Sequence, residues 1–424
     1  MRRRGKTKLH PISDLIVVGG GASGLMAAVS AARSGVRPLI LERMDRIGRK
    51  LLATGNGRCN LTNLRADRTA AGYHGAGRAF VAPSLERFGV SDTLRFFETL
   101  GLVWKTEDNG RVFPRTDQAS AVLDLLRYEL KRNRVEEICN SEVVSLEHAD
   151  GEFRMGLNNS HVHFSRAVVL AAGGRAAPLL GSNGTGYTLA RMLGHTVIEP
   201  MPAIVQIRLK EAFLKRLKGV KVEASVSLES GVSSFGPESG EILFTDYGIS
   251  GPAALKLSRE VNVMLRLDRK VSAVLDLFPE KNPEEFGHFL ETRLQTLAYK
   301  SVSDALVGMI HKRLIPVVLE YSMIDRDKPC RNLSPAETGR MRSAIKSWKL
   351  DVQGTRSWMD AQVSAGGVCT DEIDPETLES RKVRGLFFAG EIMDVDGDSG
   401  GYNLQWAWSS GHSAGVHAAA KARR

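Results

Sequence analysis

The feature that most constrains this chain is a set of three glycines close to its N-terminus. Gly19, Gly21 and Gly24 follow a short apolar run at residues 15–18 and precede a stretch of small and apolar residues at 25–33. This spacing is the G-x-G-x-x-G that joins a buried parallel strand to a helix. The first glycine permits a tight turn, the second lets backbone approach a pyrophosphate, and the third lets helix and strand pack closely. The motif predicts a βαβ arrangement for this segment.

An acidic residue completes the pattern. A second apolar run at 38–41 is followed by Glu42, eighteen residues after Gly24. A carboxylate at this position accepts hydrogen bonds from a ribose diol, and the helix N-terminus offers unpaired N–H groups to phosphates. The segment therefore predicts a dinucleotide-binding site. The alternative is a glycine-rich turn in an ordinary βαβ unit.

Length and composition indicate an ordinary globular enzyme of more than one domain. The chain has 424 residues, of which 42% are hydrophobic and 25% charged, so two or three domains are expected. Four cysteines stand far apart without a C-x-x-C pair, which argues against a metal site, a redox dithiol and a secreted disulfide framework. They are Cys59, Cys139, Cys330 and Cys369. With no apolar run long enough to span a bilayer, we expect a cytoplasmic protein.

The net charge of +10 is concentrated in part at the N-terminus. Five of the cations are Arg2, Arg3, Arg4, Lys6 and Lys8. Such a head could attract nucleic acid or anionic lipid. We favour a disordered tail on a mildly basic enzyme and expect neither a nucleic-acid nor a membrane partner.

The loop after Glu42, at residues 43–63, is rich in Gly, Asn and Arg and has no apolar periodicity. Its backbone could fold closely around an anionic ligand, with Arg49, Lys50 and Arg58 supplying charge. Cys59 could face a reactive ring, but a buried structural thiol is favoured.

The next segments alternate between helix and strand patterns. We expect helices at 91–100 and 120–131 and strands at 142–146 and 153–157. Residues 110–115 indicate a loop or an edge strand, because proline cannot join a central ladder. Residues 167–174 repeat the pattern of an apolar strand that ends in glycines, but no acidic residue follows at the spacing that a dinucleotide-binding motif requires. We therefore predict one dinucleotide site and not two.

From about residue 195 the pattern changes. Short alternating runs at 205–209, 220–228, 263–267 and 271–277 predict a mainly antiparallel sheet or barrel. Between residues 279 and 349 the period becomes helical. Asn282 and Ser303 are expected to cap two of the helices, and Ser334 begins a capping box with proline at the next position.

The C-terminal region decides which dinucleotide is bound. Residues 385–391 indicate a buried strand that ends in Gly390 and Glu391, and a glycine-rich loop then opens into a helix near Asn403. FAD needs such a second motif, because its ribityl chain and isoalloxazine extend beyond the first βαβ unit. The dipole of the last helix would stabilise the anionic reduced flavin. The alternative is that Gly400 and Gly401 only make a turn.

With these motifs in place, the chain resembles the aminoacetone-oxidase-like FAD-binding flavoproteins, a bacterial group that also includes flavoprotein reductases of bile-acid metabolism. The resemblance rests on V-V-G-G-G-A-S-G-L (17–25), G-R-K-L-L-A-T-G-N-G-R-C-N-L-T-N (48–63), A-A-G-G (171–174), F-T-D-Y-G-I-S-G-P (244–252) and A-G-E-I-M-D-V-D-G-D-S-G-G-Y-N-L-Q-W-A-W-S-S-G (389–411). It implies an α/β fold in which a Rossmann-like, glutathione-reductase-like FAD domain is interrupted by a β-barrel-like domain with a helical insertion. The implied boundaries are 1–194 and 363–424 for the FAD domain, 195–278 and 349–362 for the β domain, and 279–348 for the helical subdomain.

The resemblance also implies a set of cofactor contacts. Arg49, Lys50 and Asn60 should line the path of the pyrophosphate and ribityl chain, and Val143 should touch adenine. The full set is Gly19, Gly21, Ala22, Ser23, Gly24, Glu42, Arg43, Arg49, Lys50, Asn60, Val143, Ala172, Gly173, Gly390, Glu391, Asp396, Gly400, Gly401, Asn403 and Leu404. In the family, His often stands where this chain has Asp246.

The function expected from the sequence is that of a FAD-dependent oxidoreductase, which acts on a small molecule by hydride transfer to or from flavin N5. Members of the resembled family oxidise amines or reduce C=C bonds, and NAD(P)H is a possible donor. Groups that could lie at the flavin face are Cys59, Asn60, Tyr402, Asn403 and Tyr247, but their spacing assigns no catalytic residue. Two alternatives are a FAD-dependent RNA-modifying enzyme and a non-catalytic binding protein on the same fold. The first would need a basic stripe with stacking aromatics.

Overall fold

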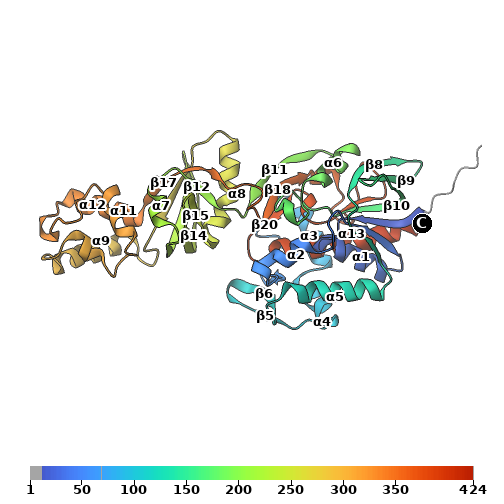
Figure 1. Ribbon diagram of the computed structural model, residues 1–424, viewed down its shortest axis with the longest axis horizontal. Helices are drawn as coiled ribbons and strands as arrows, with labels where there is room; N and C mark the ends of the chain where they lie inside the picture. The colour runs from blue at the N-terminus through green and yellow to red at the C-terminus, as the bar shows by residue number, and fades with distance from the viewer. Residues whose placement is uncertain (1–11, 68, 424) are drawn as a thin grey trace, which may run out of the picture. The chain divides into compact units, whose positions relative to one another are not determined.

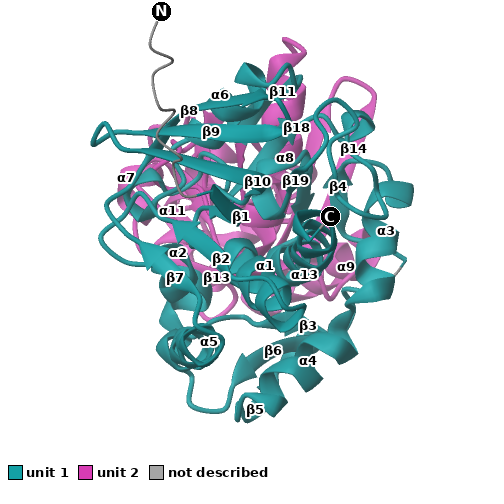
Figure 2. Cartoon of the chain, turned by 90° about the vertical axis from the view of Figure 1, so that its right-hand side faces the viewer, with its two compact units in different colours: residues 1–201, 363–424 teal, residues 202–362 magenta. Residues whose placement is uncertain are grey.

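The computed structural model describes residues 12–67 and 69–423, so the basic head at 2–8 lies outside the described residues. The chain forms two compact units (Figure 2). Unit 1 comprises Met1–Met201 and Val363–Arg424, and unit 2 comprises Pro202–Gln362. The finer domain boundaries inferred from the sequence stay a prediction.

Unit 1 is built on a seven-stranded sheet of order β7-β2-β1-β10-β9-β8, with β19 also paired to β10. Figure 1 labels β8, β9 and β10 of this sheet, and Figure 2 labels its other strands as well. The strands are β1 (Ile12–Val18), β2 (Pro38–Leu41), β7 (Glu136–Ile138), β8 (Val143–Ala149), β9 (Glu152–Leu157), β10 (Val162–Leu170) and β19 (Leu386–Phe388). The pairs β1–β2, β1–β10, β2–β7 and β10–β19 are parallel, whereas β8–β9 and β9–β10 are antiparallel. All of β2 and the second half of β1 are buried, as continuous apolar runs in a parallel sheet require. The predicted Rossmann-like core is confirmed.

Helices and short segments surround this sheet. The helices of unit 1 are α1 (Ala22–Arg33), α2 (Arg49–Ala53), α3 (Arg78–Arg87), α4 (Val90–Thr99), α5 (Ala119–Arg132), α6 (Thr185–Met192) and α13 (Tyr402–Ala422). Single 3-10 turns occupy Thr54–Gly57, Asp108–Gly110, Pro178–Leu180, Thr370–Glu372 and Gly390–Ile392.

Helix α13 packs directly on α1, backbone against backbone. A Cβ added at Gly411 would lie 2.5 Å from the carbonyl oxygen of Ser23, and one added at Gly415 would overlap that of Ala27. Only glycine permits such a close approach. The last helix of the chain is thereby fixed on the helix that follows the first glycine motif.

The remaining small sheets include one correction to the sequence prediction. They are β3 (Thr62–Asn63) with β6 (Arg111–Pro114) and β5 (Trp104–Thr106), β4 (Tyr73–Gly75) with β20 (Val395–Gly397), and β11 (Val197–Ala203) with β18 (Val363–Val368). The prediction of a loop or edge strand at 110–115 was wrong, because β6 is the middle strand. Pro114 is tolerated because β3 pairs only with Arg111 and Val112, so Pro114 faces β5 alone.

Unit 2 contains a closed barrel of order β12-β15-β14-β13-β16-β17. Its strands are β12 (Ile207–Leu209), β13 (Lys221–Ser230), β14 (Ser233–Phe244), β15 (Gly248–Ser250), β16 (Ser272–Asp276) and β17 (Trp348–Thr355). The predicted barrel is confirmed, but the strand expected at 263–267 was wrong. These residues end α8 (Pro252–Arg266), whose buried side chains recur at helical spacing through Leu257, Val261 and Met264.

The other helices of unit 2 are α7 (Leu214–Leu217), α9 (Pro283–Thr296), α10 (Val302–Leu306), α11 (Leu314–Tyr321) and α12 (Pro335–Lys346), with a 3-10 turn at Cys330–Asn332. Ser334 forms the predicted capping box. Asn282 caps α9 as predicted, and the structure shows that it too belongs to a capping box. Ser303 is not a cap, since it lies inside the first turn of α10. The cap is Ser301, whose Oγ accepts a hydrogen bond from the Asp304 N–H. Within the described ranges, no helix combines the length and apolarity needed to cross a bilayer.

The α1–α13 contact predicts a large effect of one methyl group. Gly415→Ala should lower the free energy of unfolding by about 1–3 kcal/mol, because the new Cβ meets backbone that cannot move aside. Thermal and urea unfolding measure the change. Gly339→Ala in α12 is the matched control, since its Cβ would have no described atom within 4 Å. That variant should gain about 0.5–1 kcal/mol. Equal effects of the two substitutions would contradict the close packing.

Candidate functional site

The three glycines of the first motif have different surroundings. Gly19 has φ +105°, and a Cβ there would lie 2.5 Å from the Ala171 oxygen. A Cβ at Gly24 would overlap the Gly19 oxygen, so these two positions are held by packing. A Cβ at Gly21, by contrast, would meet no described atom within 4 Å. The middle glycine thus borders open space, as a residue that faces a ligand should.

The N-terminus of α1 is prepared for an anion. Gly21 caps the helix with its backbone alone, and the described first turn holds no acidic side chain. The first N–H groups of a helix have no partner inside it, so those of Ala22, Ser23 and Gly24 can bind phosphate oxygens. Nearby, Glu42 is buried and accepts hydrogen bonds from the N–H groups of Gly20 (2.8 Å) and Met44 (2.7 Å). Each carboxylate oxygen retains a lone pair for a ribose hydroxyl.

The C-terminal strand-Gly-acid motif meets this region. Ser23 Oγ donates to the Ala389 oxygen at 3.3 Å, and a Cβ at Gly390 would overlap Ser23 Oγ. Glu391 pairs with Lys50 (Oε2 to Nζ, 2.7 Å) and accepts the Ser364 N–H (2.9 Å). Residues far apart in sequence therefore converge, and the charges of Lys50 and Glu391 balance each other.

Ser364 organises the third glycine segment and was missed from the sequence. Its Oγ accepts hydrogen bonds from the N–H groups of Arg175 (2.8 Å) and Ala176 (3.0 Å). A Cβ at Gly174 would lie 2.7 Å from the Ser364 Cβ and 2.8 Å from Glu391 Oε1. Ala172 and Gly173, both expected cofactor contacts, precede this point. A lone serine in a strand carries no sequence signal for such a role.

Arg43 follows β2 and is the neighbour of Glu42, whereas Val143 begins β8, two residues after Ser141, whose N–H donates to the Glu42 backbone oxygen at 2.8 Å. Arg43 pairs with Glu142 (Nε to Oε1, 3.2 Å) and donates to the Gly181 oxygen (3.3 Å). Burial alone would raise the pKa of Glu142, but hydrogen bonds from Asn183 and Thr185 and the charge of Arg43 bring it below its usual value. Val143 is buried at the start of β8. The adenine contact expected for it stays a prediction.

A glycine-rich loop leads into α13. Gly401 caps the helix at φ +109°, and the described first turn again holds no acidic residue. The side chain of Asn403 donates to the Gly397 oxygen (2.7 Å) and accepts from the Gly397 N–H (2.9 Å). It therefore holds the loop, and a ligand would meet Asn403 and Leu404 through their backbone N–H groups. Asp396 is buried in β20.

Cys59 and Asn60 are neighbours in the loop at 54–63, and only Asn60 has a side chain that is available to a ligand. Cys59 is fully buried, and this burial raises the pKa of its thiol to about 12. The thiol is therefore neutral at physiological pH and unsuited to nucleophilic attack. Asn60 Oδ1 is buried and has no hydrogen-bond partner among the described residues. An unpaired buried acceptor calls for a water or a ligand donor.

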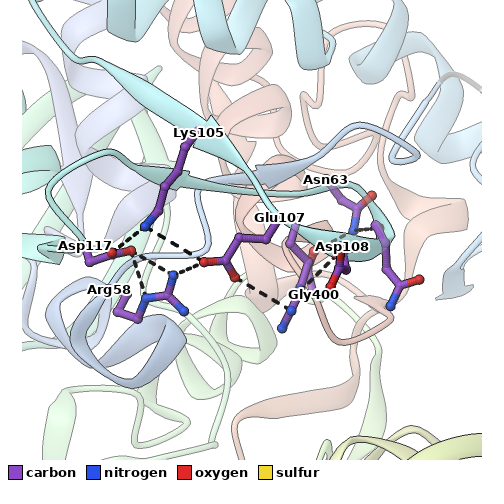
Figure 3. Close-up of polar contacts among 9 residues, drawn as sticks. Arg58, Asn63, Lys105, Glu107, Asp108, Asp117 and Gly400 are labelled. Carbon is purple, nitrogen blue, oxygen red and sulfur yellow. Dashed lines mark hydrogen bonds and ion pairs between the residues drawn. The ribbon is translucent and has the colours of Figure 1, made fainter.

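Arg58 of the same loop is balanced by protein carboxylates (Figure 3). Its guanidinium pairs with Glu107 and with Asp117 (2.8 Å), and it stacks on Phe113 at 4.1 Å. Hydrogen bonds from Arg58 to Glu107 and from Lys105 to Asp117 lower the pKa values of these carboxyls. The positive charge of Arg58, which the sequence analysis assigned to an anionic ligand, thus stabilises the loop itself.

The same network reaches the last glycine loop. Asn63 Nδ2 donates to the Gly400 oxygen at 2.8 Å and to the Asn109 oxygen at 3.2 Å. A Cβ at Gly401 would overlap Thr62, so the loop before α13 lies against β3.

Arg49 stands apart from these contacts. It pairs with Asp45 at 3.2 Å and, with Arg46, Leu52, Ala53 and Leu180, lines an open hollow of about 240 Å³. Tyr247 belongs to unit 2. Among the described residues, no group of His, Cys, Asp and Glu could hold a metal ion.

The residues present fit a flavin dinucleotide. The N-termini of α1 and α13 are capped by glycine backbone, and Gly21 borders open space. Asn60 Oδ1 accepts no hydrogen bond from the described residues. No contact between FAD and an individual residue is tested by this geometry, so the contact set expected from the sequence stays a prediction.

Known proteins match nearly the whole length of this chain. The family model described as HI0933-like protein Rossmann domain matches residues 13–417. The 3-dehydro-bile acid delta(4,6)-reductase of Clostridium scindens is 40% identical over 405 residues, covering 95% of this chain and 98% of the relative. The ribosomal RNA dihydrouridine synthase of Escherichia coli strain K12 is 32% identical over 400 residues, covering 94% and 96%. The solved 3-ketosteroid-delta4-(5alpha)-dehydrogenase from Rhodococcus jostii RHA1 aligns with TM-score 0.51 and 16% identity over 99% of this chain and 100% of that chain.

These matches confirm FAD as the cofactor and a flavin-dependent oxidoreductase as the class of enzyme. The resemblance to reductases of bile acids is also confirmed, whereas the aminoacetone-oxidase-like designation stays a prediction. The expected absence of a nucleic-acid partner is not confirmed, because relatives named for RNA modification are among the matches.

The surroundings of Gly21 predict a variant that folds but loses its cofactor. Gly21→Val should leave the far-ultraviolet circular dichroism and the apoprotein's unfolding midpoint unchanged, because the side chain enters open space. It should lose most bound FAD, because the valine blocks the approach of the pyrophosphate. Flavin absorbance per purified chain measures the loss. Gly24→Ala is the comparison, since it should disturb the fold itself; full FAD content in Gly21→Val would contradict the assignment.

Proposed function

Because the chain belongs to the HI0933-like Rossmann family, we propose that it reduces a C=C bond conjugated to a carbonyl group in a small molecule. The observation that carries this proposal is the full-length similarity to the bile-acid reductase, at 40% identity. That relative's name describes a 3-oxo compound with double bonds at positions 4 and 6, which are conjugated with the oxo group.

The second relative supports the same reaction type. Dihydrouridine differs from uridine by saturation of the C=C bond next to a ring carbonyl, and the Escherichia coli relative is named for making it. Both names describe the saturation of a C=C bond that a carbonyl polarises. This shared chemistry favours C=C reduction over amine oxidation.

Within unit 1, the residues would hold FAD by backbone more than by cations. The first-turn N–H groups of α1 would bind the phosphates, Glu42 the ribose, and Asn60 the ribityl or ring region. When bound and reduced, FAD supplies a hydride from N5. The N-terminus of α13 would stabilise negative charge, and the neutral Cys59 takes no covalent part.

In the proposed reduction, the hydride and the proton add to different carbons of the conjugated bond. A hydride adds to the carbon β to the carbonyl, and the C=C electron pair moves to the α carbon and the carbonyl oxygen as an enolate. Protonation of the α carbon by water restores the carbonyl. The substrate gains one hydride, which carries two electrons, and one proton; a nicotinamide-type donor would supply the hydride that reduces the flavin again.

A second candidate function is reduction of uracil in RNA. It is favoured by the name of the Escherichia coli relative and by a basic cluster on unit 2. The cluster consists of Lys215, Arg216, Lys218, Lys312 and Arg313; Arg313 joins its two segments by donating to the oxygens of Arg216 (2.8 Å) and Lys218 (3.0 Å). Glu320 and Asp246 neutralise Arg216 and Lys218, which weakens its attraction for phosphate.

The two candidate functions differ in the electron acceptor that reoxidises the reduced flavin, which is a small molecule in the first and RNA in the second. Anaerobically reduced holoenzyme mixed with a 3-oxo-4,6-diene steroid acid should regain its oxidised flavin absorbance, because the conjugated bond accepts the hydride. The saturated 3-oxo analogue is the control and should leave the flavin reduced. Mass spectrometry should show a mass gain of two hydrogens in the product.

The same reduced holoenzyme mixed with an rRNA transcript tests the second candidate. Reoxidation by RNA alone, with formation of dihydrouridine and loss of both at high salt, would replace the first proposal by the second. Bleaching of the oxidised enzyme by amines, with no reaction of either acceptor, would contradict C=C reduction altogether.

A further inference from the structure

Asn60 of unit 1 carries a buried acceptor that has no partner, in a loop whose other polar side chains are paired. Its Oδ1 accepts no hydrogen bond from the described residues. Asn63, in the same loop, uses both ends of its amide: Nδ2 donates to the Gly400 oxygen at 2.8 Å, and Oδ1 accepts the Arg65 N–H at 3.0 Å. Because nearly all buried polar atoms in folded proteins are paired, Asn60 Oδ1 indicates a donor that the described residues do not supply.

The residues that follow Asn60 are tied to the last helix. The backbone oxygen of Leu61 accepts a hydrogen bond from Trp408 Nε1 at 2.9 Å, and both side chains are fully buried. Thr62 Oγ1 donates to Oε1 of Gln405, in the first turn of α13, at 2.6 Å. These contacts lie within unit 1, and they hold the segment after Asn60 against the start of α13.

The loop before α13 closes on the same segment. A Cβ at Gly401, the cap of α13, would overlap Thr62, and Asn63 holds the Gly400 oxygen (Figure 3). Thr62 is two residues from Asn60, a span of at most about 7 Å along the chain. Asn60 therefore lies close to the N-terminus of α13.

The backbone before Asn60 is fixed as well. The Cys59 N–H donates to the Thr54 oxygen at 2.9 Å, and a Cβ added at Gly55 would lie 2.9 Å from the Asn60 nitrogen. With contacts on both sides of it, Asn60 cannot shift to find a donor in the protein without breaking them. Its unpaired oxygen is thus held in place for a donor that arrives with a ligand.

The chemistry of FAD restricts what this donor can be. The oxidised flavin ring carries a single N–H, at N3, between the C2 and C4 carbonyls, whereas N1, N5 and both carbonyl oxygens are acceptors. The N–H groups at the start of α13 suit N1 and the C2 oxygen, where the negative charge of the reduced ring collects. Because N3 is bonded to C2, an acceptor beside that helix N-terminus is in the right place for the N3–H.

We infer that Asn60 Oδ1 accepts a hydrogen bond from the N3–H of the flavin and thereby orients the pyrimidine end of the ring at the N-terminus of α13. The group that Asn60 recognises is an imide N–H between two carbonyls. The inference rests on FAD as the cofactor and is independent of the C=C reduction proposed above. It assigns Asn60 a positioning role towards the ring.

An FAD analogue without this N–H tests the contact by binding alone. Full-length apoprotein is titrated with FAD and with N3-methyl-FAD, and flavin fluorescence measures both affinities. The unmodified protein should bind the analogue at least about 10-fold more weakly, because one hydrogen bond is lost. Asn60→Ala should bind FAD about 10-fold more weakly than the unmodified protein does. It should also bind the two flavins equally, because the acceptor that distinguishes them is gone.

Asn63→Ala is the matched control, with the same substitution in the same loop. The Asn63 amide bonds to the protein, so its loss should lower the unfolding midpoint of the apoprotein and weaken both flavins to the same degree. The preference for FAD over N3-methyl-FAD should remain. Asn60→Ala should leave that unfolding midpoint unchanged, because Asn60 Oδ1 bonds to no described residue.

The midpoint potential of the bound flavin distinguishes N3 from N5. The N3–H is present in both redox states, so Asn60→Ala should leave the potential nearly unchanged. The N5–H exists only in the reduced flavin. A tenfold loss of binding to the reduced form alone would lower the potential by about 30 mV.

Three results would overturn the inference. A preference for FAD that survives in Asn60→Ala would place the acceptor of the N3–H elsewhere. Equal binding of both flavins by the unmodified protein would leave Asn60 Oδ1 to a ribityl hydroxyl or to water. A fall of about 30 mV in Asn60→Ala would assign this oxygen to the N5–H. None of these results bears on the substrate, which the dienone and RNA experiments test separately.

Discussion

The contact between α1 and α13 is the constraint on which the cofactor site of unit 1 depends. Gly411 and Gly415 place the backbone of the last helix on the backbone of α1, with no side chain between them. A hydrogen bond from Ser23 to Ala389 spans 366 positions of the sequence at the same junction. Because protein interiors are close-packed and hard to compress, the two glycine-capped helix N-termini keep a fixed separation. Two ends of the polypeptide thus act as one rigid binding element.

The charges of this site are mostly satisfied by the protein itself. Lys50 is balanced by Glu391, and Arg58 by Glu107 and Asp117. These pairs hold the 49–63 loop and the strand-Gly-acid motif in place. They therefore contribute to the site by positioning its segments and not by attracting an anion. The positive potential that remains for a dinucleotide comes from helix dipoles and free N–H groups. In the proposed site, phosphate would be bound without cations that need to be desolvated, a penalty that is large for buried charges.

Local patterns could be predicted from the sequence, and long-range pairings could not. The β1–α1–β2 unit and the caps at Asn282 and Ser334 depend on neighbours within a few residues, so their signals are contained in short windows. The strand predicted at residues 263–267 was wrong because five alternating residues cannot distinguish a strand from the end of a helix. The roles of Ser364 and Arg58 depend on partners from distant segments. Nothing in a single sequence encodes which carboxylate will meet a given arginine.

A flavin enzyme that saturates a polarised C=C bond needs one thing that the flavin cannot provide, which is a place for the charge that collects on the carbonyl oxygen. Cys59 is a buried neutral thiol, and the Asn403 side chain holds its own loop, so neither side chain meets this need. Within unit 1, the first turn of α13 holds no acidic side chain, so its N–H groups would stabilise negative charge on a reduced flavin.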